Sequence, residues 1–223
     1  MKILALDTST NACSVALSIN GEIQERHVVA PRQHTSLVLP MIEELMHSAG
    51  LNAPQLDVVA FGRGPGSFVG VRIAAAVTQG IAFAGNLPVV AISSMAALAQ
   101  GTSFQHVLVA FDARMNEVYW GSYTRDNGGL VKPTAAEVVC SPSTINSKSY
   151  DTLTWHGVGT GWDSYEQQLK SSFPDIEVHN TILYPHAADI ALLGAESYRC
   201  GAIIEAHEVQ PVYIRNKVVS RPV

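Results

Sequence analysis

The alternation of apolar and polar residues at the start of the chain predicts three strands. Lys2–Leu6 is a short apolar run suited to a buried strand, and Ala12–Ile19 alternates with the period of a half-buried strand. Asn20-Gly21 is a strong hairpin turn signal, and Glu22–Val29 follows it as a third strand. Strands joined by such tight turns should be antiparallel neighbours.

The pattern then changes to alternating helices and strands. Thr35 or Ser36 can cap a helix that runs to about Ala49 and stops at Gly50. The next predicted elements are a strand at Leu56–Phe61, a helix at Gly70–Ala84, a strand at Pro88–Ile92 and a short helix, capped by Ser93 or Ser94, that ends at Gln100. The order predicts an α/β fold with a mixed sheet and helices on its faces.

The second half of the chain is less regular. A strand pair is predicted at His106–Asp112 and Glu117–Tyr123, and a further strand at Leu153–Val158. Helices are predicted at Asp163–Ser172 and His186–Arg199, and the polar segment Asn127–Ser149 reads as a surface excursion. A boundary near Gly101–Ser103 divides the chain into an N-terminal lobe, residues 1–102, and a C-terminal lobe, residues 103–223.

The helix at Gly70–Ala84 has too few charged residues for a solvated surface helix. At roughly 100° per residue, Ile73, Val77, Ile81 and Ala84 share the face expected to pack on the sheet. The opposite face carries Arg72, Ala76, Gln79 and Phe83, flanked by Ala75 and Ala82. A solvent-facing helix surface normally carries several charges, and small side chains allow another helix to approach closely.

The preceding helix is also apolar over a wider arc than sheet packing needs. Eight apolar residues cover about 200° of it: Leu37, Val38, Leu39, Met41, Ile42, Leu45, Met46 and Ala49. Either the second half of the chain covers the two helices, or they form an interface with another subunit. We favour the interface, with contacts from Leu37, Met41, Leu45, Arg72, Ala75, Ala76, Gln79 and Phe83.

Composition narrows the classes of function. The 223 residues are 47% hydrophobic and 15% charged, with a formal net charge of -5 and no basic run, which argues against autonomous binding of tRNA or DNA. The three cysteines are far apart and suggest free thiols in a reducing compartment. No secretory signal is evident, and Arg72, Thr78 and Gln79 interrupt the longest apolar tract, so a soluble cytoplasmic protein is expected.

Two loops are candidate anion sites. Asp7, Thr8, Ser9 and Thr10 lie between the first two strands, where N–H groups and hydroxyls can surround an anion and the carboxylate can hold Mg²⁺ through water. An ordinary polar turn is the competing interpretation. In the second loop, GRGPGSFVG, residues Gly64, Gly66 and Ser67 precede a helix start that can stabilise an anion. It matches neither a Walker loop nor GxGxxG, and its glycines can equally serve tight turning and close packing.

Other common catalytic patterns are missing from the sequence. The eight histidines form no HxxxH or HExxH pair, and there is no Gly-x-Ser-x-Gly elbow, so no metal site and no peptidase are expected. Asp112, Arg114 and Glu117 lie close together in FDARMNEVYW and predict a structural charged cluster at a hairpin end.

Five segments of the chain together resemble the TsaB (YeaZ) family: ILALDTSTNACSVAL, PRQHTSLVLPMIEELM, GRGPGSFVGVRIAAAVTQGIA, FDARMNEVYWGSY and QPVYIRN. The resemblance implies an actin-like, sugar-kinase-like (ASKHA) fold with two related lobes, the second reduced. It also implies a role in making threonylcarbamoyladenosine in tRNA anticodon loops. The implied partners are the paralogous transferase TsaD, as a heterodimer, and the ATPase TsaE, with a homodimer when the chain is alone.

One departure from the catalytic paralogues bears on the activity. Those relatives carry a metal-binding His-Met-Glu-Gly-His segment, where this chain reads Ser94-Met95-Ala96-Ala97-Leu98. Ser, Ala and Leu cannot replace imidazole as ligands of a transition metal. We therefore expect no catalytic residues and no cofactor of the chain's own, and the junction with TsaD stays open as a site for ATP or ADP. The alternative is a nucleotide-dependent phosphotransferase or ATPase that uses Asp7, Ser9 and Gly64–Ser67.

Overall fold

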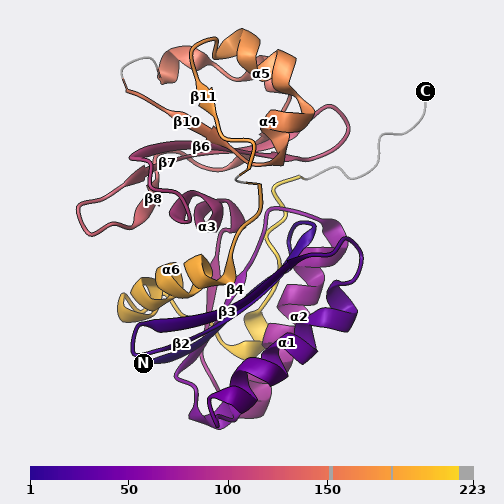
Figure 1. The fold of residues 1–223 in the computed structure, drawn as a ribbon, viewed down its shortest axis with the longest axis vertical. Helices are drawn as coiled ribbons and strands as arrows, with labels where there is room; N and C mark the ends of the chain where they lie inside the picture. Colours follow the sequence, from indigo (N-terminus) through magenta and orange to yellow (C-terminus); the bar gives the residue numbers. More distant parts are fainter. Residues whose placement is uncertain (151–152, 182, 216–223) are drawn as a thin grey trace.

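The computed structural model describes residues 1–150, 153–181 and 183–215, arranged as two lobes that each contain a mixed sheet (Figure 1). The end of the predicted second lobe, residues 216–223, lies outside the described residues, as does Asn216 of the QPVYIRN segment. The first sheet has the order β3-β2-β1-β4-β5. Its strands are β1 Lys2–Asp7, β2 Ala12–Ile19, β3 Glu22–Val29, β4 Val58–Gly62 and β5 Val89–Ile92.

The first sheet is covered on both faces. Helices α1 (His34–Ser48) and α2 (Phe68–Gly85) pack on one face, against inward side chains such as Leu4, Leu6 and Phe61. Helix α6 (Ala187–Arg199) packs on the other face, against Ile3 and Ala5 (Figure 1). Because successive side chains of a strand point to opposite faces, β1 contributes to both cores.

The second sheet repeats the topology of the first. Its order is β11-β10-β6-β7-β8, with β9 pairing β7. Its strands are β6 His106–Asp112, β7 Val118–Arg125, β8 Val131–Pro133, β9 Val138–Cys140, β10 His156–Val158 and β11 Glu177–Val178. As with β1, β2 and β4 in the first lobe, β6 pairs antiparallel with β7 and parallel with β10. The outer strands have only two or three residues, so the predicted reduced second lobe is confirmed.

Short helices cover the second sheet and link it to the first lobe. Helices α4 (Thr160–Ser164) and α5 (Glu166–Ser172) lie on one face around Trp120 and Trp162, and α3 (Ser94–Gln100) lies on the other. Four short 3-10 helices complete the described elements: Ala53–Gln55, Pro142–Thr144, Ser147–Ser149 and Ala206–Glu208. The predicted single helix at Asp163–Ser172 is therefore two helices that meet at Tyr165.

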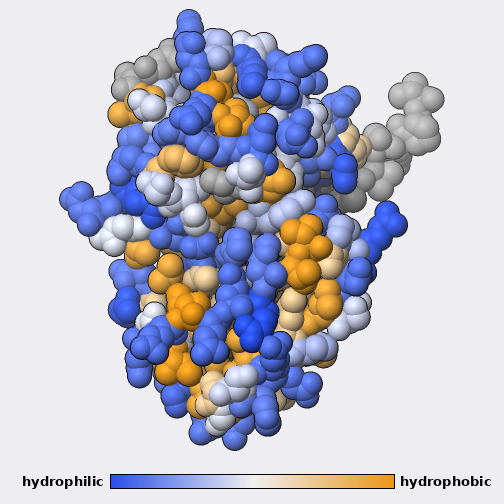
Figure 2. Space-filling model, viewed as in Figure 1, coloured by the Kyte–Doolittle hydropathy of each residue, from blue (hydrophilic) through white to orange (hydrophobic). Residues whose placement is uncertain are grey.

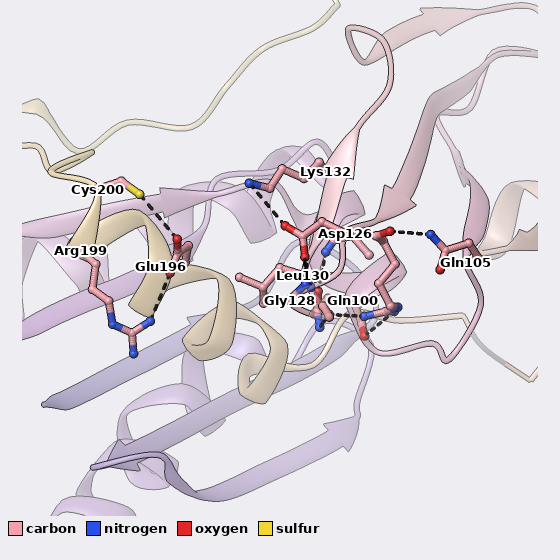
Figure 3. Close-up of polar contacts among 12 residues, drawn as sticks. Gln100, Gln105, Asp126, Gly128, Leu130, Lys132, Glu196, Arg199 and Cys200 are labelled. Carbon is pink, nitrogen blue, oxygen red and sulfur yellow. Dashed lines mark hydrogen bonds and ion pairs between the residues drawn. The ribbon is translucent and has the colours of Figure 1, made fainter.

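A hydrogen-bonded turn connects β7 and β8 to the end of α3 (Figure 3). One carboxylate oxygen of Asp126 accepts from the N–H groups of Gly128 and Leu130, and Lys132 pairs with the other oxygen at 3.5 Å. The Gln100 side chain donates to the carbonyl of Gly129 and accepts from the N–H of Val131. The segment Asn127–Ser149, expected to be a surface excursion, instead contributes β8 and β9 to the second sheet.

The proposed division at residue 102 needs a correction. Helix α6 belongs by sequence to the predicted second lobe, but Ile190 and Ala191 are buried in the first. Its start is fixed by Glu25 on β3, whose carboxylate accepts from the Ala188 N–H at 3.1 Å and lies 2.9 Å from His186 Nδ1. The chain therefore returns to the first lobe after β11, and the two lobes are not consecutive halves.

Candidate functional site

Helix α2 has one buried side and one exposed apolar side. The Ser67 hydroxyl caps its start by accepting from the Gly70 N–H at 3.3 Å. Val71, Ala74, Ala75, Thr78 and Ala82 lie on the buried side, against the sheet. On the other side Val69 is 62% exposed and Phe83 is 76% exposed, with Ala76 and Gly80 also exposed between them. This surface of Val69, Ala76, Gly80 and Phe83 is called the α2 face below.

The predicted rotation of α2 is wrong. Ile73, Val77 and Ile81 are only half-buried and Ala84 is exposed, so these residues are not the main contact with the sheet. Small residues at positions 74, 75 and 82 allow the helix backbone to lie close to the strands, which turns the larger side chains outward. Ala75 is 6% exposed and Leu45 is fully buried, so the prediction that these two side chains contact a partner is also wrong.

The neighbouring helix α1 continues the apolar surface. Leu37 and Met41 are half-buried and pack at the margin of the same core as Ile73 and Val77. Leu39 is 54% exposed. Figure 2 shows hydrophobic surface on the lower lobe, over the region where Figure 1 places α1 and α2. Exposed apolar residues that gather in this way mark an interaction surface more often than isolated ones do.

Arg72 is the one charged residue of helix α2, and its side chain is held locally. The Arg72 guanidinium lies 3.4 Å from the centre of the Phe68 ring and 4.9 Å from that of Tyr213. It also donates to the Phe68 carbonyl oxygen at 2.6 Å. Gln79 is also exposed, about two turns further along the helix. Arg72 thus stacks its guanidinium on the Phe68 ring and leaves part of its charge at the rim of the α2 face.

By length and composition alone, α2 is long and apolar enough to cross a membrane. Its 18 residues have a mean hydropathy of 1.5. Arg72, Thr78 and Gln79 were expected to make this tract too polar to cross a membrane. By its composition the tract is apolar enough, so that expectation is wrong. In the structure the helix lies along the first sheet with Thr78 fully buried. Its hydropathy is high because both the sheet-facing side and the outer side are apolar.

The loop from Asp7 to Thr10 divides into a buried half and a half that faces a cleft. Asp7 is 1% exposed, and its carboxylate accepts from the Ser9 N–H, the Ser9 hydroxyl and the Ser94 hydroxyl at 2.6–2.8 Å. Thr8 is fully buried and donates to the Gly70 carbonyl at 2.7 Å. Burial raises the pKa of Asp7 above its usual value, against these hydrogen bonds, which lower it.

The glycine loop packs directly on this turn. A Cβ atom at Gly66 would overlap the Ser9 carbonyl, and one at Gly70 would overlap the Thr8 carbonyl. The Ser67 N–H donates to the Ser9 carbonyl at 2.6 Å. Gly64 has φ +93 and lies near Val71. Close approach of two backbones accounts for these glycines without a ligand, which favours the packing interpretation of the loop.

A cleft of about 620 Å³ lies between the lobes and collects part of the predicted anion site. Ser9, Thr10, Gly66 and Ser67 line it from the first lobe. Asp7, Thr8 and Gly64 do not line it. The other wall includes Asp112, Arg114, Thr160, Tyr213 and Arg215. No sequence motif marks Thr160, Tyr213 or Arg215 as site residues, because only the fold brings them opposite the β1–β2 turn.

The predicted charged cluster at the β6–β7 hairpin is confirmed. Arg114 pairs with Asp112 at 2.9 Å, and Glu117 pairs with Arg215 from the C-terminal segment. Asp112 also accepts from the Tyr165 hydroxyl at 3.1 Å, and its N–H donates to the Thr160 hydroxyl. Among the described residues that line the cleft, the charges of Arg114 and Arg215 are thus offset by Asp112 and Glu117, which leaves no concentrated positive field there for a polyphosphate.

Comparison with known proteins identifies the family. A family profile described as TsaD: tRNA N6-adenosine threonylcarbamoyltransferase matches residues 26–219. The "tRNA threonylcarbamoyladenosine biosynthesis protein TsaB" of Escherichia coli (strain K12) is 36% identical over 98% of this chain and 96% of its own length. The protein of the same name from Haemophilus influenzae is 41% identical, over 98% and 95%.

A solved structure agrees with the sequence relatives. "YeaZ from Pseudomonas aeruginosa" superposes with a TM-score of 0.88 at 41% identity, covering 95% of this chain and 99% of that one. The two mixed sheets of like topology are those of the actin-like (ASKHA) fold, so the predicted fold class is confirmed. On these matches and this fold, the chain belongs to the TsaB (YeaZ) family.

Proposed function

We propose that this chain is a non-catalytic activating subunit in the synthesis of tRNA threonylcarbamoyladenosine, acting in the cytoplasm. It binds a TsaD-type transferase through the α2 face and the adjoining residues of α1, and TsaE joins the pair. The names of the relatives support the role in this biosynthesis. The observation that carries the docking proposal is the α2 face, which exposes Val69 and Phe83 around small residues, with Arg72 at its rim as the one charged residue of α2.

The energetics favour covering this surface. Burying one Phe or Val side chain contributes about 1.5–3 kcal/mol. Ala76 and Gly80 lie between the two large side chains, so a partner helix can approach the α2 backbone closely. Leu37 and Met41 lie where a second partner helix would pack on α1. A paralogous partner of the same fold would offer equivalent helices, and the same surface supports a homodimer when the partner is absent.

The state of Asp7 supports the non-catalytic part of the proposal. In a phosphotransferase this carboxylate would have to face the cleft and hold Mg²⁺ through water. Here the carboxylate oxygens of Asp7 accept hydrogen bonds from Ser9 and Ser94. Gly62 lies so close to this carboxylate that a Cβ atom at position 62 would overlap it. Ser94 is the first residue of the segment that stands in place of the metal-binding sequence of the paralogues.

Reconstitution of the tRNA modification tests the role directly. We expect purified TsaD, TsaE, donor and tRNA to modify tRNA slowly without this chain and at full rate with it. Ala76→Glu places a charge at the centre of the α2 face and should abolish co-purification with TsaD, homodimerisation in light scattering, and activation. Ala136→Glu, at an exposed alanine between β8 and β9, is the matched control. Unchanged association of Ala76→Glu would refute the surface, and full modification without the chain would refute the activator role.

The alternative function is a nucleotide-dependent phosphotransferase or ATPase. The interlobe cleft favours it, because Ser9, Thr10, Gly66 and Ser67 meet there. Calorimetry with ATP and Mg²⁺ on the isolated chain separates the two functions. Tight binding with turnover that is lost in Asp7→Asn would support the alternative, whereas binding only in the presence of TsaD would place a nucleotide at the junction of the two subunits.

A further inference from the structure

Two histidines and a glutamate far apart in sequence meet on one face of the second sheet. In the parallel pair β10–β11, His156 lies directly opposite Glu177, so their side chains point to the same face. His179 is two residues after Glu177 and shares that face, and its N–H continues the ladder by donating to the Gly157 carbonyl at 2.9 Å. The strand register thus brings the three side chains together.

The distances between their polar atoms suit a shared cation. His156 Nδ1 lies 3.1 Å from His179 Nε2 and 3.5 Å from Glu177 Oε2, and His179 Nε2 lies 3.8 Å from Glu177 Oε1. Zinc bonds of about 2.0–2.2 Å in a tetrahedron place the ligand atoms about 3.3–3.6 Å apart. An ion can therefore occupy the space between the three atoms after shifts of a few tenths of an ångström.

One aromatic ring holds both imidazoles in place. Phe104 stacks on His156 with ring centres 4.1 Å apart and on His179 with ring centres 4.3 Å apart. Both histidine side chains are about one-fifth exposed, whereas that of Glu177 is 68% exposed. The imidazoles are thus pre-positioned and mostly desolvated, while the carboxylate can close on an ion from the solvent side. His106, nearby on β6, is engaged with the Thr124 hydroxyl and is not part of the set.

We propose that His156, Glu177 and His179 bind a divalent transition-metal ion of the zinc class, with the fourth position open to water. Two imidazoles and one carboxylate suit Zn²⁺ or Co²⁺ better than Mg²⁺ or Ca²⁺, which prefer oxygen ligands. The ion fastens β11, an edge strand of only two residues, to β10. Its role is structural, because metal binding stabilises the folded arrangement that assembles its ligands.

Titration of the metal-free full chain with Zn²⁺ and Co²⁺ tests the site. We expect one equivalent to bind, Co²⁺ to give the intense visible spectrum of tetrahedral coordination, and Zn²⁺ to raise the melting temperature. Mg²⁺ should do none of these. His156→Ala and His179→Ala should each weaken binding at least about 100-fold, since loss of a mere supporting residue already costs 10–100-fold. Glu177→Gln is exposed enough to preserve the fold and should weaken binding about tenfold or more.

The matched control is His207→Ala, an exposed histidine in the 3-10 helix Ala206–Glu208 of the first lobe. It should bind like the parent chain. Protection of the β11 amides from hydrogen exchange should rise with Zn²⁺ in the parent and in His207→Ala only. Equal binding by the parent, His156→Ala and Glu177→Gln would overturn the proposal and leave the His156–His179 contact as a simple hydrogen bond. A six-coordinate Co²⁺ spectrum or no binding would overturn it as well.

Discussion

The hydrogen bond from Ser94 to Asp7 ties α3 to the end of β1, and Ser94→Ala removes it. The donor and acceptor atoms are 2.6 Å apart, and both side chains are 1% exposed or less. The variant leaves one carboxylate oxygen buried without that donor. A hydrogen bond to a charged group contributes about 1.5–3 kcal/mol, so at a pH above the raised pKa of Asp7 the free energy of unfolding should fall by about that amount.

A double-mutant cycle with Asp7→Asn measures how much of the effect of Ser94→Ala depends on the negative charge of Asp7. Asp7→Asn keeps the shape of the side chain and can still accept from Ser9 and pair with Ser94, so Ser94→Ala in that background should cost only about 0.5–1.5 kcal/mol. Urea unfolding followed by fluorescence and circular dichroism measures both differences. With a slope near 3 kcal/mol per M, the midpoint should fall by about 0.5–1 M for Ser94→Ala alone. Ser48→Ala, at an exposed position of α1, is the matched control.

The direction in which the stabilisation by Asp7 changes with pH follows from its raised pKa. The pKa of Asp7 is raised in the folded chain, chiefly by burial, so between its ordinary value of 3.8 and the raised value the folded state holds more protons than the unfolded state. The contribution of Asp7 to stability therefore falls as the pH rises through this window. The penalty of Ser94→Ala should be largest above the window, where the carboxylate is ionised, and shrink below it. An equal penalty in both backgrounds, or one that grows towards low pH, would refute a buried ionised acceptor.

Two further predictions concern packing and pH. Gly70→Ala should lower the free energy of unfolding by more than about 2 kcal/mol, because the added Cβ atom would overlap the Thr8 carbonyl. Gly80→Ala should raise the free energy of unfolding by about 0.5–1 kcal/mol, because the space around Gly80 is open and alanine favours the helix more than glycine does. Urea unfolding checks both, and a destabilised Gly80→Ala would contradict the exposed placement of that position. Glu25→Gln should cost about 2–3 kcal/mol at pH 7, because hydrogen bonds from His186, Ala188 and Ser14 overcome burial and lower the pKa of Glu25 from 4.5 to about 2. The stabilisation by Glu25 is present above pH 4.5 and is lost as the pH falls towards 2. The free energies of unfolding of the parent and of Glu25→Gln, measured across this range, should therefore converge near pH 2. A difference that persists at pH 2 would contradict the lowered pKa of Glu25.

Local patterns predicted the strands and helices of the first lobe well. The bounds of β2 and β3 agree with the prediction, because alternation and the Asn20-Gly21 turn are encoded in adjacent residues. The side of α2 that packs on the sheet was predicted wrongly. The sequence shows which residues of α2 are apolar. Which side of the helix faces the sheet depends on its small residues, because they let the helix backbone lie close to β4 in the folded chain.

Features that depend on distant pairing could not be read from the sequence. His156 and Glu177 become neighbours through the β10–β11 register, and neither residue lies in a recognisable metal spacing. The return of α6 to the first lobe depends on Glu25 of β3, far away in the chain. The burial of Asp7 likewise depends on Ser94 from another element. Each of these contacts requires the completed sheets.

The C-terminal segment has a consequence for any shortened or extended form of the protein. Ile204 forms a bridge with Val89 on the first sheet, and the Val212 N–H donates to the Arg63 carbonyl. Arg215 then pairs with Glu117 on the second lobe. This C-terminal segment therefore contacts both lobes. A chain that ended before Pro211 would lose Val212, Tyr213 and Arg215 from the lining of the cleft, together with the Arg215–Glu117 ion pair between the lobes.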